Sequence, residues 1–330
     1  PPKPFIRDRP SGGVVPSGAK VVIADPIDPS AVEHLRAAGV AVVDATSGAD
    51  ALVAALPDAW ALVVRSRTRV TAELLGHANR LALVARAGVG VDNVDVPAAS
   101  AKGIRVVNAP GAATGSVAEL TIGLYLALAR DLVERARATR AGDWKRGELG
   151  FELSGKTVGF IGYGRIAREI ARRLQPFRVR TMAFDPFVTT AVDATEIGPI
   201  DAVLAGSDIV SVHAALTPEN HHLLNATRLA QMKRGAYLVN VARGALVDET
   251  ALLAALDSGQ LAGAALDVFE TEPPTGSRLL GHPRVIPTPH IGASTREAQK
   301  RAGVEVADEI LRAIRGERLS AVVNPEVAAR

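Results

Sequence analysis

Three ionisable residues in the second half of the chain are of types that together can move a proton beside an anionic group. They are Arg243, Glu272 and His290. A histidine is the natural acid or base near neutral pH, and a carboxylate beside it orients the imidazole and stabilises its charged form. An arginine binds a carboxylate through two hydrogen bonds and polarises a neighbouring carbonyl. The set therefore suits the oxidation of an alcohol that carries a carboxylate, provided that a hydride acceptor is bound nearby.

Each of these residues comes at or just after the end of a short apolar stretch that can form a buried parallel strand. The stretches span residues 236–240, 262–267 and 285–288. In a parallel α/β sheet, ligands collect at the carboxyl ends of the strands. We therefore expect all three side chains at one edge of one sheet, although Arg243 or Glu272 taken alone is equally consistent with a surface residue.

A glycine-rich turn near the middle of the chain is suited to hold the hydride acceptor. Gly162, Gly164 and Ala167 follow the apolar run 157–161 in G-x-G-x-x-A spacing, and a helical pattern begins at Arg165. The first glycine permits the tight turn, the second lets a pyrophosphate approach, and the small third residue lets the helix pack on the strand. The helix N-terminus favours an anion. The pattern predicts a dinucleotide-binding turn; the alternative is a plain strand-to-helix turn of another α/β fold.

Asp185 closes the next apolar run, residues 180–185, where it can accept hydrogen bonds from the ribose hydroxyls of adenosine. Between Pro186 and Leu204 the sequence has no Lys or Arg that could bind a 2′-phosphate. The sequence therefore predicts NAD rather than NADP as the cofactor.

Composition narrows the class of protein further. The 38 Lys and Arg against 35 Asp and Glu leave a net charge of +3, with no basic tract typical of nucleic-acid binding. The chain has no cysteine, which excludes disulfides and thiolate catalysis, and no histidine or acidic cluster has metal-ligand spacing. No apolar run approaches the roughly 18 residues of a membrane span, and the first residues show no signal-peptide pattern. We expect a cytoplasmic protein without metal, nucleic acid or membrane partner.

Apolar runs alternate with helical segments along most of the chain, as is typical of doubly wound α/β domains. Residues 1–18, with five prolines and three glycines, predict a flexible tail. We expect short strands up to residue 107, one long helix over 116–141, and a last helix over 295–315 that returns to the first domain. The expected α/β fold has a flavodoxin-like substrate-binding domain (19–112 and 295–330) into which an NAD-binding Rossmann domain (113–294) is inserted.

Several runs match one enzyme family. They are Val64-Arg-Ser, Ala85-Arg-Ala-Gly-Val-Gly-Val-Asp-Asn-Val-Asp, the cofactor turn, Val241-Ala-Arg-Gly, Leu266-Asp-Val-Phe and Pro289-His-Ile-Gly-Ala-Ser-Thr. On these runs the chain resembles the D-isomer-specific 2-hydroxyacid dehydrogenases over about residues 20–324. The last run, extended by Glu297-Ala-Gln, is typical of the branch that acts on 3-phospho-D-glycerate.

The resemblance implies NAD-dependent oxidation of 3-phospho-D-glycerate to 3-phosphohydroxypyruvate, or the reverse, by hydride transfer at C2. This reaction is a step of serine biosynthesis. The resemblance also implies a homodimer. It implies that the catalytic set is Arg243, Glu272 and His290. The implied cofactor contacts are Val89, Gly162, Gly164, Arg165, Ile166, Asp185, Ala214, Val241, Ala242, Asp267, Gly292 and Ala293, with Asp267 on the nicotinamide amide. The implied substrate contacts are Arg65, Ser66, Arg86, Val89, Gly90, Arg243 and His290. The regulatory C-terminal domain of longer relatives is expected to be absent.

Departures from the family pattern concern the substrate rather than the reaction. Ala113 takes the place of an asparagine that relatives using phosphoglycerate carry, and Ala215 stands where a proline is usual. A phosphonate analogue, hydroxypyruvate or glyoxylate is therefore an alternative substrate. A non-enzymatic, corepressor-like protein that senses NAD(H) is an alternative of another class, although the complete Arg, Glu and His set argues against it.

Overall fold

The computed structural model describes residues 19–144, 149–191 and 193–327, and the expected N-terminal tail lies outside them. The described chain divides into two compact units. Unit 1 consists of the residues up to Ala113 together with those from Thr295 onward, and unit 2 is Thr114–Ser294. Each unit is built around its own sheet.

Unit 1 contains one parallel sheet with helices on both faces. Its elements are β1 (Lys20–Ile23), α1 (Pro29–Ala37), β2 (Ala41–Asp44), α2 (Ala49–Ala55), η1 (Leu56–Asp58), β3 (Ala61–Val64), α3 (Ala72–Gly76), β4 (Leu83–Arg86), α4 (Val96–Ala101), β5 (Arg105–Asn108) and α11 (Arg296–Ile314). The five strands lie in the order β2-β1-β3-β4-β5, all parallel. This order is that of flavodoxin-like sheets, in which the chain reverses its direction of winding between the first and third strands.

The alternation of side chains along each strand explains why both faces are covered. Val21 and Ile23 of β1 pack with residues of α1 and α11, whereas Val22 packs on the other face with residues of α2, α3 and α4. Because both faces are buried, the strands are continuously apolar rather than alternating with polar residues. Helices α1, α3, α4 and α11 begin at side-chain caps, as at Thr71 before α3, whose oxygen accepts from Leu74 N.

Unit 2 contains the larger sheet. Its elements are α5 (Thr114–Ala129), α6 (Leu132–Arg140), β6 (Thr157–Ile161), α7 (Arg165–Leu174), η2 (Gln175–Phe177), β7 (Arg180–Phe184), β8 (Glu196–Ile197), α8 (Ile200–Gly206), β9 (Ile209–Val212), η3 (Pro218–Asn220), α9 (Ala226–Gln231), β10 (Ala236–Asn240), η4 (Gly244–Leu246), α10 (Glu249–Asp257), β11 (Leu261–Leu266), η5 (Arg278–Gly281) and β12 (Val285–Pro287). The seven parallel strands lie in the order β12-β11-β10-β9-β6-β7-β8.

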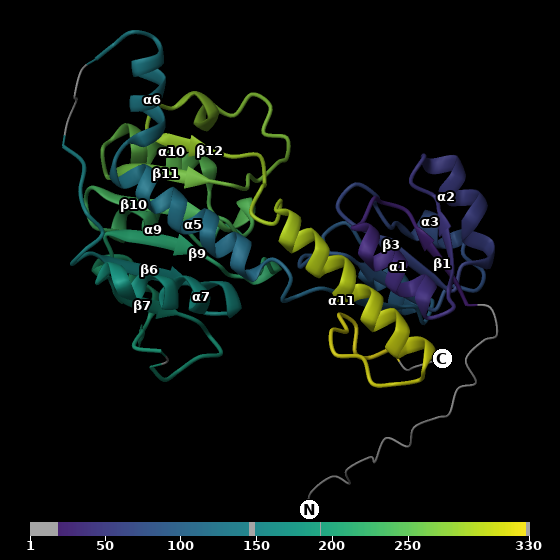
Figure 1. The fold of residues 1–330 in the computed structure, drawn as a ribbon. Coiled ribbons are helices and arrows are strands. Elements are labelled where there is room, and N and C mark those ends of the chain that lie inside the picture. The colour runs from purple at the N-terminus through teal and green to yellow at the C-terminus, as the bar shows by residue number, and fades with distance from the viewer. Residues whose placement is uncertain (1–18, 145–148, 192, 328–330) are drawn as a thin grey trace, which may run out of the picture. The chain divides into compact units, whose positions relative to one another are not determined.

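The strand order of unit 2 reverses between β6 and β9, which makes this the crevice where doubly wound sheets bind ligands. Helices α5 and α7 lie side by side on one face of the sheet (Figure 1), where Leu124 and Ile170 join one apolar cluster with Phe160. Helices α8, α9 and α10 contribute to a second cluster on the opposite face. The predicted α/β class with parallel sheets is therefore confirmed in both units.

The prediction of one long helix over 116–141 is wrong. The helix ends at Ala129, and a separate helix, α6, begins at Leu132. Asp131 between them has a φ of 49°, the left-handed conformation that an α-helix cannot contain. None of the residues of α6 is buried, so the apolar stripe of α5 has no continuation to hold a single straight helix against the sheet.

Candidate active site

The glycine turn after β6 shows two different reasons for its glycines. Gly162 has a φ of 89°, and a Cβ at this position would lie 2.7 Å from Ala214 N and 2.8 Å from the carbonyl carbon of His213. The fold itself therefore requires glycine there. A Cβ at Gly164 would meet nothing within 4 Å, so the fold does not require this glycine. Its effect is to leave the space before the N-terminus of α7 open, which fits a bound pyrophosphate.

The remaining residues of the turn follow the expected pattern. Ala167 is fully buried against the sheet, which is consistent with the need for a small third residue. Arg165 is exposed and Ile166 half-buried in the first turn of α7, while Ala214 lies half-buried after β9. These three residues therefore border the open space, and their contacts with a cofactor stay a prediction.

Asp185 follows β7, the strand that pairs with β6. Its Oδ2 accepts a hydrogen bond from Tyr163 N at 2.8 Å and its Oδ1 accepts one from Phe187 N at 2.9 Å. Tyr163 is fully buried, and its hydroxyl lies 2.6 Å from Thr195 Oγ1. The half-buried carboxylate of Asp185 thus helps to fix the glycine turn. Each of its oxygens retains a lone pair for a ribose hydroxyl.

Arg243 is positioned by a buried amide that the sequence analysis did not single out. Asn240, 1% exposed at the end of β10, donates from Nδ2 to Arg243 O at 2.9 Å and accepts from Ala242 N at 3.0 Å. The half-buried Arg243 side chain donates from Nη1 to Ala242 O at 2.7 Å. Val241 and Ala242 are half-buried in the same turn. In the sequence, an asparagine that closes an apolar run was the signal that could have revealed this role.

The turn after Arg243 packs directly on the chain that leaves β11. A Cβ at Gly244 would lie 1.9 Å from the carbonyl carbon of Phe269 and 2.3 Å from Glu270 N, so only glycine fits. The Phe269 N–H in turn donates to Glu272 Oε1 at 3.2 Å. This close backbone approach connects the segment of Arg243 to the segment of Glu272.

Glu272 and His290 are brought together as the sequence predicted. The Glu272 Oε2 lies 2.8 Å from His290 Nδ1, and the two side chains are 38% and 50% exposed. With Nδ1 donating to the carboxylate, the Nε2 of the imidazole is the nitrogen that can accept a proton. His290 lies in the loop after β12 and has a φ of 52°. A positive φ is uncommon for residues other than glycine.

The carboxylate of Asp267 accepts hydrogen bonds from that loop. It is 1% exposed, and its Oδ1 accepts from Thr288 Oγ1 at 2.6 Å and from Ile291 N at 2.8 Å, while its Oδ2 accepts from Gly292 N at 2.8 Å. The structure thus uses both oxygens inside the protein. The predicted contact between Asp267 and the nicotinamide stays a prediction beside this observed role.

A pocket of about 560 Å³ lies beside the paired glutamate and histidine. It is lined by Asp267, Phe269, Glu272, Pro273, Pro274, Leu280, Pro287, Thr288, Pro289 and His290. Gly292 is buried and Ala293 exposed in the loop that follows. The pocket therefore offers an apolar wall next to the two residues that could transfer a proton.

His213, at the end of β9, lies beside the glycine turn. Its Nε2 is 2.8 Å from Ser211 Oγ, and its ring packs against Phe160 with centroids 5.7 Å apart. Burial lowers the pKa of His213 to about 3, so the ring is neutral at physiological pH. A neutral aromatic ring can form part of the floor of the cofactor site, but it cannot neutralise a phosphate.

The predicted substrate residues of unit 1 follow two neighbouring strands, β3 and β4. Arg65 is half-buried and donates from Nη1 to Pro26 O at 3.2 Å, and Ser66 is exposed. The Arg86 side chain folds over Gly88, where a Cβ would come within 1.5 Å of Arg86 Nη1.

Val89 and Gly90 are half-buried in the loop after β4. Asn108 Nδ2 donates to Val89 O at 2.5 Å, so another strand-end amide anchors this loop. In unit 1 the structure thus gathers Arg65, Arg86, Val89 and Gly90 at the carboxyl ends of adjacent strands.

Two features are absent from the described residues. No helix among them is long and apolar enough to cross a membrane. Within the same ranges, no three His, Asp or Glu side chains are grouped as a metal ion would need.

Comparison with known proteins identifies the family that this chain resembles. The family model described as D-isomer specific 2-hydroxyacid dehydrogenase, NAD binding domain, matches residues 122–292. The D-3-phosphoglycerate dehydrogenase of Homo sapiens is 44% identical over 312 residues, which cover 93% of this chain and 58% of the human protein. The chain thus spans less than two thirds of that relative's length.

Solved structures match over the whole of their own chains. A glyoxylate reductase from Paecilomyes thermophila has a TM-score of 0.85 at 31% identity, covering 94% of this chain and 99% of that one. An NAD-dependent formate dehydrogenase from Staphylococcus aureus, solved in complex with NAD, has a TM-score of 0.82 at 32% identity and covers 94% and 100%. The fold is therefore shared by proteins named for different substrates.

Proposed function

The chain belongs to the D-isomer-specific 2-hydroxyacid dehydrogenases, and from this premise we propose that it interconverts 3-phospho-D-glycerate and 3-phosphohydroxypyruvate with NAD. Membership supports NAD-dependent dehydrogenation of a 2-hydroxy acid as the reaction. The observation that carries the catalytic part of the proposal is the 2.8 Å contact between Glu272 Oε2 and His290 Nδ1. The identity to the human enzyme supports the choice of substrate.

In the proposed mechanism, His290 is the acid and base. During oxidation its Nε2 accepts the hydroxyl proton of the substrate, and the hydrogen on C2 leaves as a hydride. Glu272 fixes the tautomer through Nδ1 and stabilises the positive charge that develops on the ring. Arg243 binds the substrate carboxylate and, in the reverse direction, polarises the C2 carbonyl. Bound NAD supplies the hydride acceptor, and the turn from Gly162 to Ala167 would hold its pyrophosphate.

The choice among substrates depends on unit 1 in this proposal. Arg65 and Arg86 supply positive charge for the phosphate, and the Val89–Gly90 backbone binds the carboxylate. The second candidate substrate is a phosphonate analogue, hydroxypyruvate or glyoxylate, because Ala113 and Ala215 depart from the family pattern. The similar fold of a glyoxylate reductase favours testing these acids as well.

One enzyme assay tests the reaction and the substrate together. NADH oxidation is followed with 3-phosphohydroxypyruvate, phosphonopyruvate, hydroxypyruvate, glyoxylate and pyruvate. The proposal expects a kcat/KM at least about a hundredfold higher for 3-phosphohydroxypyruvate, equivalent to roughly 2.7 kcal/mol of transition-state binding. A preference for another acid would retain the family and reject the substrate. NADH binding without turnover of any acid would favour the non-enzymatic sensor.

The role of His290 is tested by His290→Ala in the same assay. The variant should lose turnover and keep the NADH dissociation constant, because the imidazole acts on the substrate and the cofactor is held by the glycine turn. Unchanged turnover would remove His290 from the mechanism.

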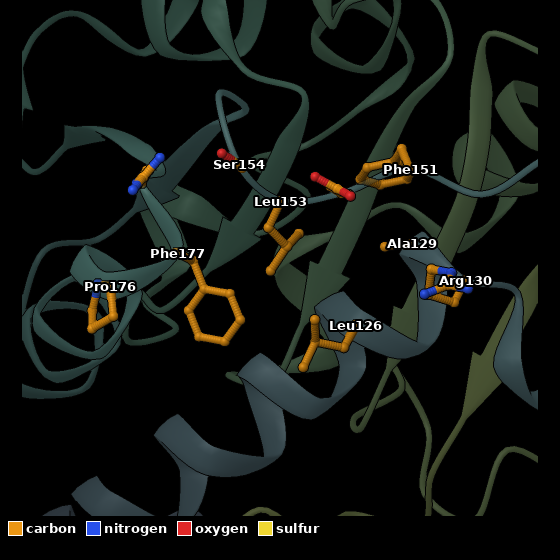
Figure 2. A pocket seen from close by; sticks show the side chains of 10 residues that line it. Leu126, Ala129, Arg130, Phe151, Leu153, Ser154, Pro176 and Phe177 are labelled. Atoms are coloured by element: carbon orange, nitrogen blue, oxygen red, sulfur yellow. The ribbon is translucent and has the colours of Figure 1, made fainter.

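We also propose that a second copy of the chain covers one apolar surface of unit 2. Leu132 and Val133 of α6 are 58% and 50% exposed, and a nine-residue helix without buried residues is not stable alone in water. Leu126 of α5 and Phe177 of η2 line a pocket together with Leu153 (Figure 2). None of its lining residues belongs to the predicted catalytic set. A measured solution mass of one chain would contradict the homodimer.

A further inference from the structure

A buried carboxylate in unit 1 accepts several hydrogen bonds from the loop that carries Arg65. Asp25 is 1% exposed directly after β1, and it accepts hydrogen bonds from Arg65 N at 2.6 Å, Thr68 N at 3.1 Å and Thr68 Oγ1 at 2.6 Å. A fourth comes from Arg67 Nε at 3.2 Å. Burial acts to raise the pKa of Asp25, but the hydrogen bonds from Thr68, Arg65 and Arg67 outweigh it and the pKa lies below the usual value. Asp25 is therefore an ionised, fully bonded group.

The position of Asp25 in the sheet is the place where ligands are expected. Asp25 follows β1 and Arg65 follows β3, and these strands pair side by side with Ile23 opposite Val63. The order β2-β1-β3-β4-β5 reverses between β1 and β3, and flavodoxin-like sheets bind ligands outside the carboxyl ends of the strands at that reversal. The loop that Asp25 holds thus borders the ligand-binding crevice of this sheet.

The two arginines of the loop have different tasks. Arg67 donates from Nη2 to Ala24 O at 2.9 Å and to Thr46 O at 3.0 Å, besides its bond to Asp25. Within the described part of unit 1, the Arg65 guanidinium makes one hydrogen bond, from Nη1 to Pro26 O. A guanidinium has five N–H donors, so Arg65 retains four of them for a ligand, whereas Arg67 is engaged by the protein.

A second, part-buried contact fixes the same backbone. Asn93 Nδ2 donates to Arg65 O at 2.7 Å and to Thr68 O at 2.6 Å. Asp25 therefore binds the N–H groups at the two ends of the loop, and Asn93 binds the carbonyls of the same two residues. Together they define the backbone from which the Arg65 side chain starts.

We propose that Asp25 is a positioning residue for substrate recognition: it fixes the Arg65–Thr68 loop and engages Arg67, so that Arg65 rather than Arg67 offers its guanidinium to the anionic group of the substrate farthest from C2. This inference rests on the proposed function, which assigns Arg65 to the substrate. Asp25 acts through Arg65 and touches no substrate atom. Its removal should change substrate affinity rather than the chemical step.

The test compares Asp25→Asn, Arg65→Ala and the double variant in the full chain. Asp25→Asn should raise the KM for 3-phosphohydroxypyruvate about tenfold, because a neutral amide cannot accept all four donors. Its kcat should stay within about twofold, and the NADH dissociation constant should not change. The double variant should have the KM of Arg65→Ala, since coupled residues are not additive.

Two further variants separate positioning from loss of stability. Glu309→Gln alters another buried carboxylate of unit 1, which accepts from Ser320 N at 2.9 Å and Ala321 N at 3.3 Å; it should lower Tm without changing KM. Thr68→Ala removes one hydrogen bond to Asp25 and should raise KM about threefold. It keeps the test decisive if Asp25→Asn does not fold.

The outcomes distinguish this inference from the proposed function. If Arg65→Ala raises KM while Asp25→Asn and Thr68→Ala do not, or if the effects add in the double variant, the positioning role is overturned. If the wild-type chain reduces a different acid of the panel, the proposed substrate has failed. A parallel KM rise for that acid in Asp25→Asn and Arg65→Ala would still support the inference, and an unchanged KM in Arg65→Ala would overturn it.

Discussion

The close packing at Gly244 makes a quantitative prediction for Gly244→Ala. The added Cβ would lie 1.9 Å from the Phe269 carbonyl carbon, 2.1 Å from its oxygen and 2.3 Å from Glu270 N. Ordinary contacts begin near 3.4 Å. Since the obstacle is backbone, the segment after β11 or the turn after β10 must move by about 1.5 Å, which typically costs 1–3 kcal/mol or more.

That displacement separates the segments of Arg243 and Glu272, which flank the contact. A misplacement of about 1 Å can lower an enzyme's rate about a hundredfold. We therefore expect Gly244→Ala to lower kcat/KM for the preferred 2-oxo acid about a hundredfold. The free energy of unfolding, measured by urea denaturation, should fall by about 2 kcal/mol.

Gly281→Ala is the matched control, because a Cβ at that glycine of unit 2 meets nothing within 4 Å. It should change stability by less than about 0.5 kcal/mol and leave kcat/KM unchanged. A folded Gly244→Ala variant with wild-type kcat/KM and stability would refute the reasoning that this contact positions the segments of Arg243 and Glu272 for the proposed reaction.

Two predictions concern the cofactor side of unit 2. Asp185→Ala should weaken NADH about tenfold while changing NADPH less, because it removes the proposed ribose acceptor and the bond to Tyr163 N. Equal weakening of both in fluorescence titrations would contradict the assignment. His213 has a pKa of about 3 in the folded chain against an ordinary value of 6.5. Between these pH values the unfolded chain binds a proton that the folded chain does not. The free energy of unfolding therefore falls as the pH falls through this window. His213→Gln should reduce the slope of unfolding free energy against pH in that window by up to about 1.4 kcal/mol per pH unit, and an unchanged slope from urea denaturation at pH 4–6 would count against it.

The sequence predicted the sheets well because their signals are local. Strand β3, Ala61–Val64, is one of the short strands expected before residue 107, and it is recognisable because a run buried on both faces is apolar throughout. The turn at Gly162 was recognisable for the same reason, because its strand, glycines and helix are contiguous. The pairing of Glu272 with His290 needed the further assumption that the ends of parallel strands meet, and the 2.8 Å contact bears this out.

What the sequence did not reveal depends on partners far away in the chain. Asp25 contacts a loop 40 residues later, and nothing in its own segment distinguishes it from an ordinary loop acid. Asn240 acts on the backbone of its own turn, yet its burial follows from strands on both sides of β10. The break at Asp131 was missed because periodicity describes which face is apolar, not whether the protein has a surface for that face.

The chain passes between the two units twice, and within each unit the two chain positions at these passages lie close together. In unit 2, a Cβ at Gly292 would lie 3.2 Å from Val117, so the unit begins and ends at neighbouring positions. In unit 1, Arg301 Nε donates to Ala112 O at 2.9 Å, so the two cut ends of the host are also adjacent. A segment with adjacent ends can be excised, replaced or transplanted without stretching its host. Residues 114–294 are thus a block that recombination can exchange whole while unit 1 is kept.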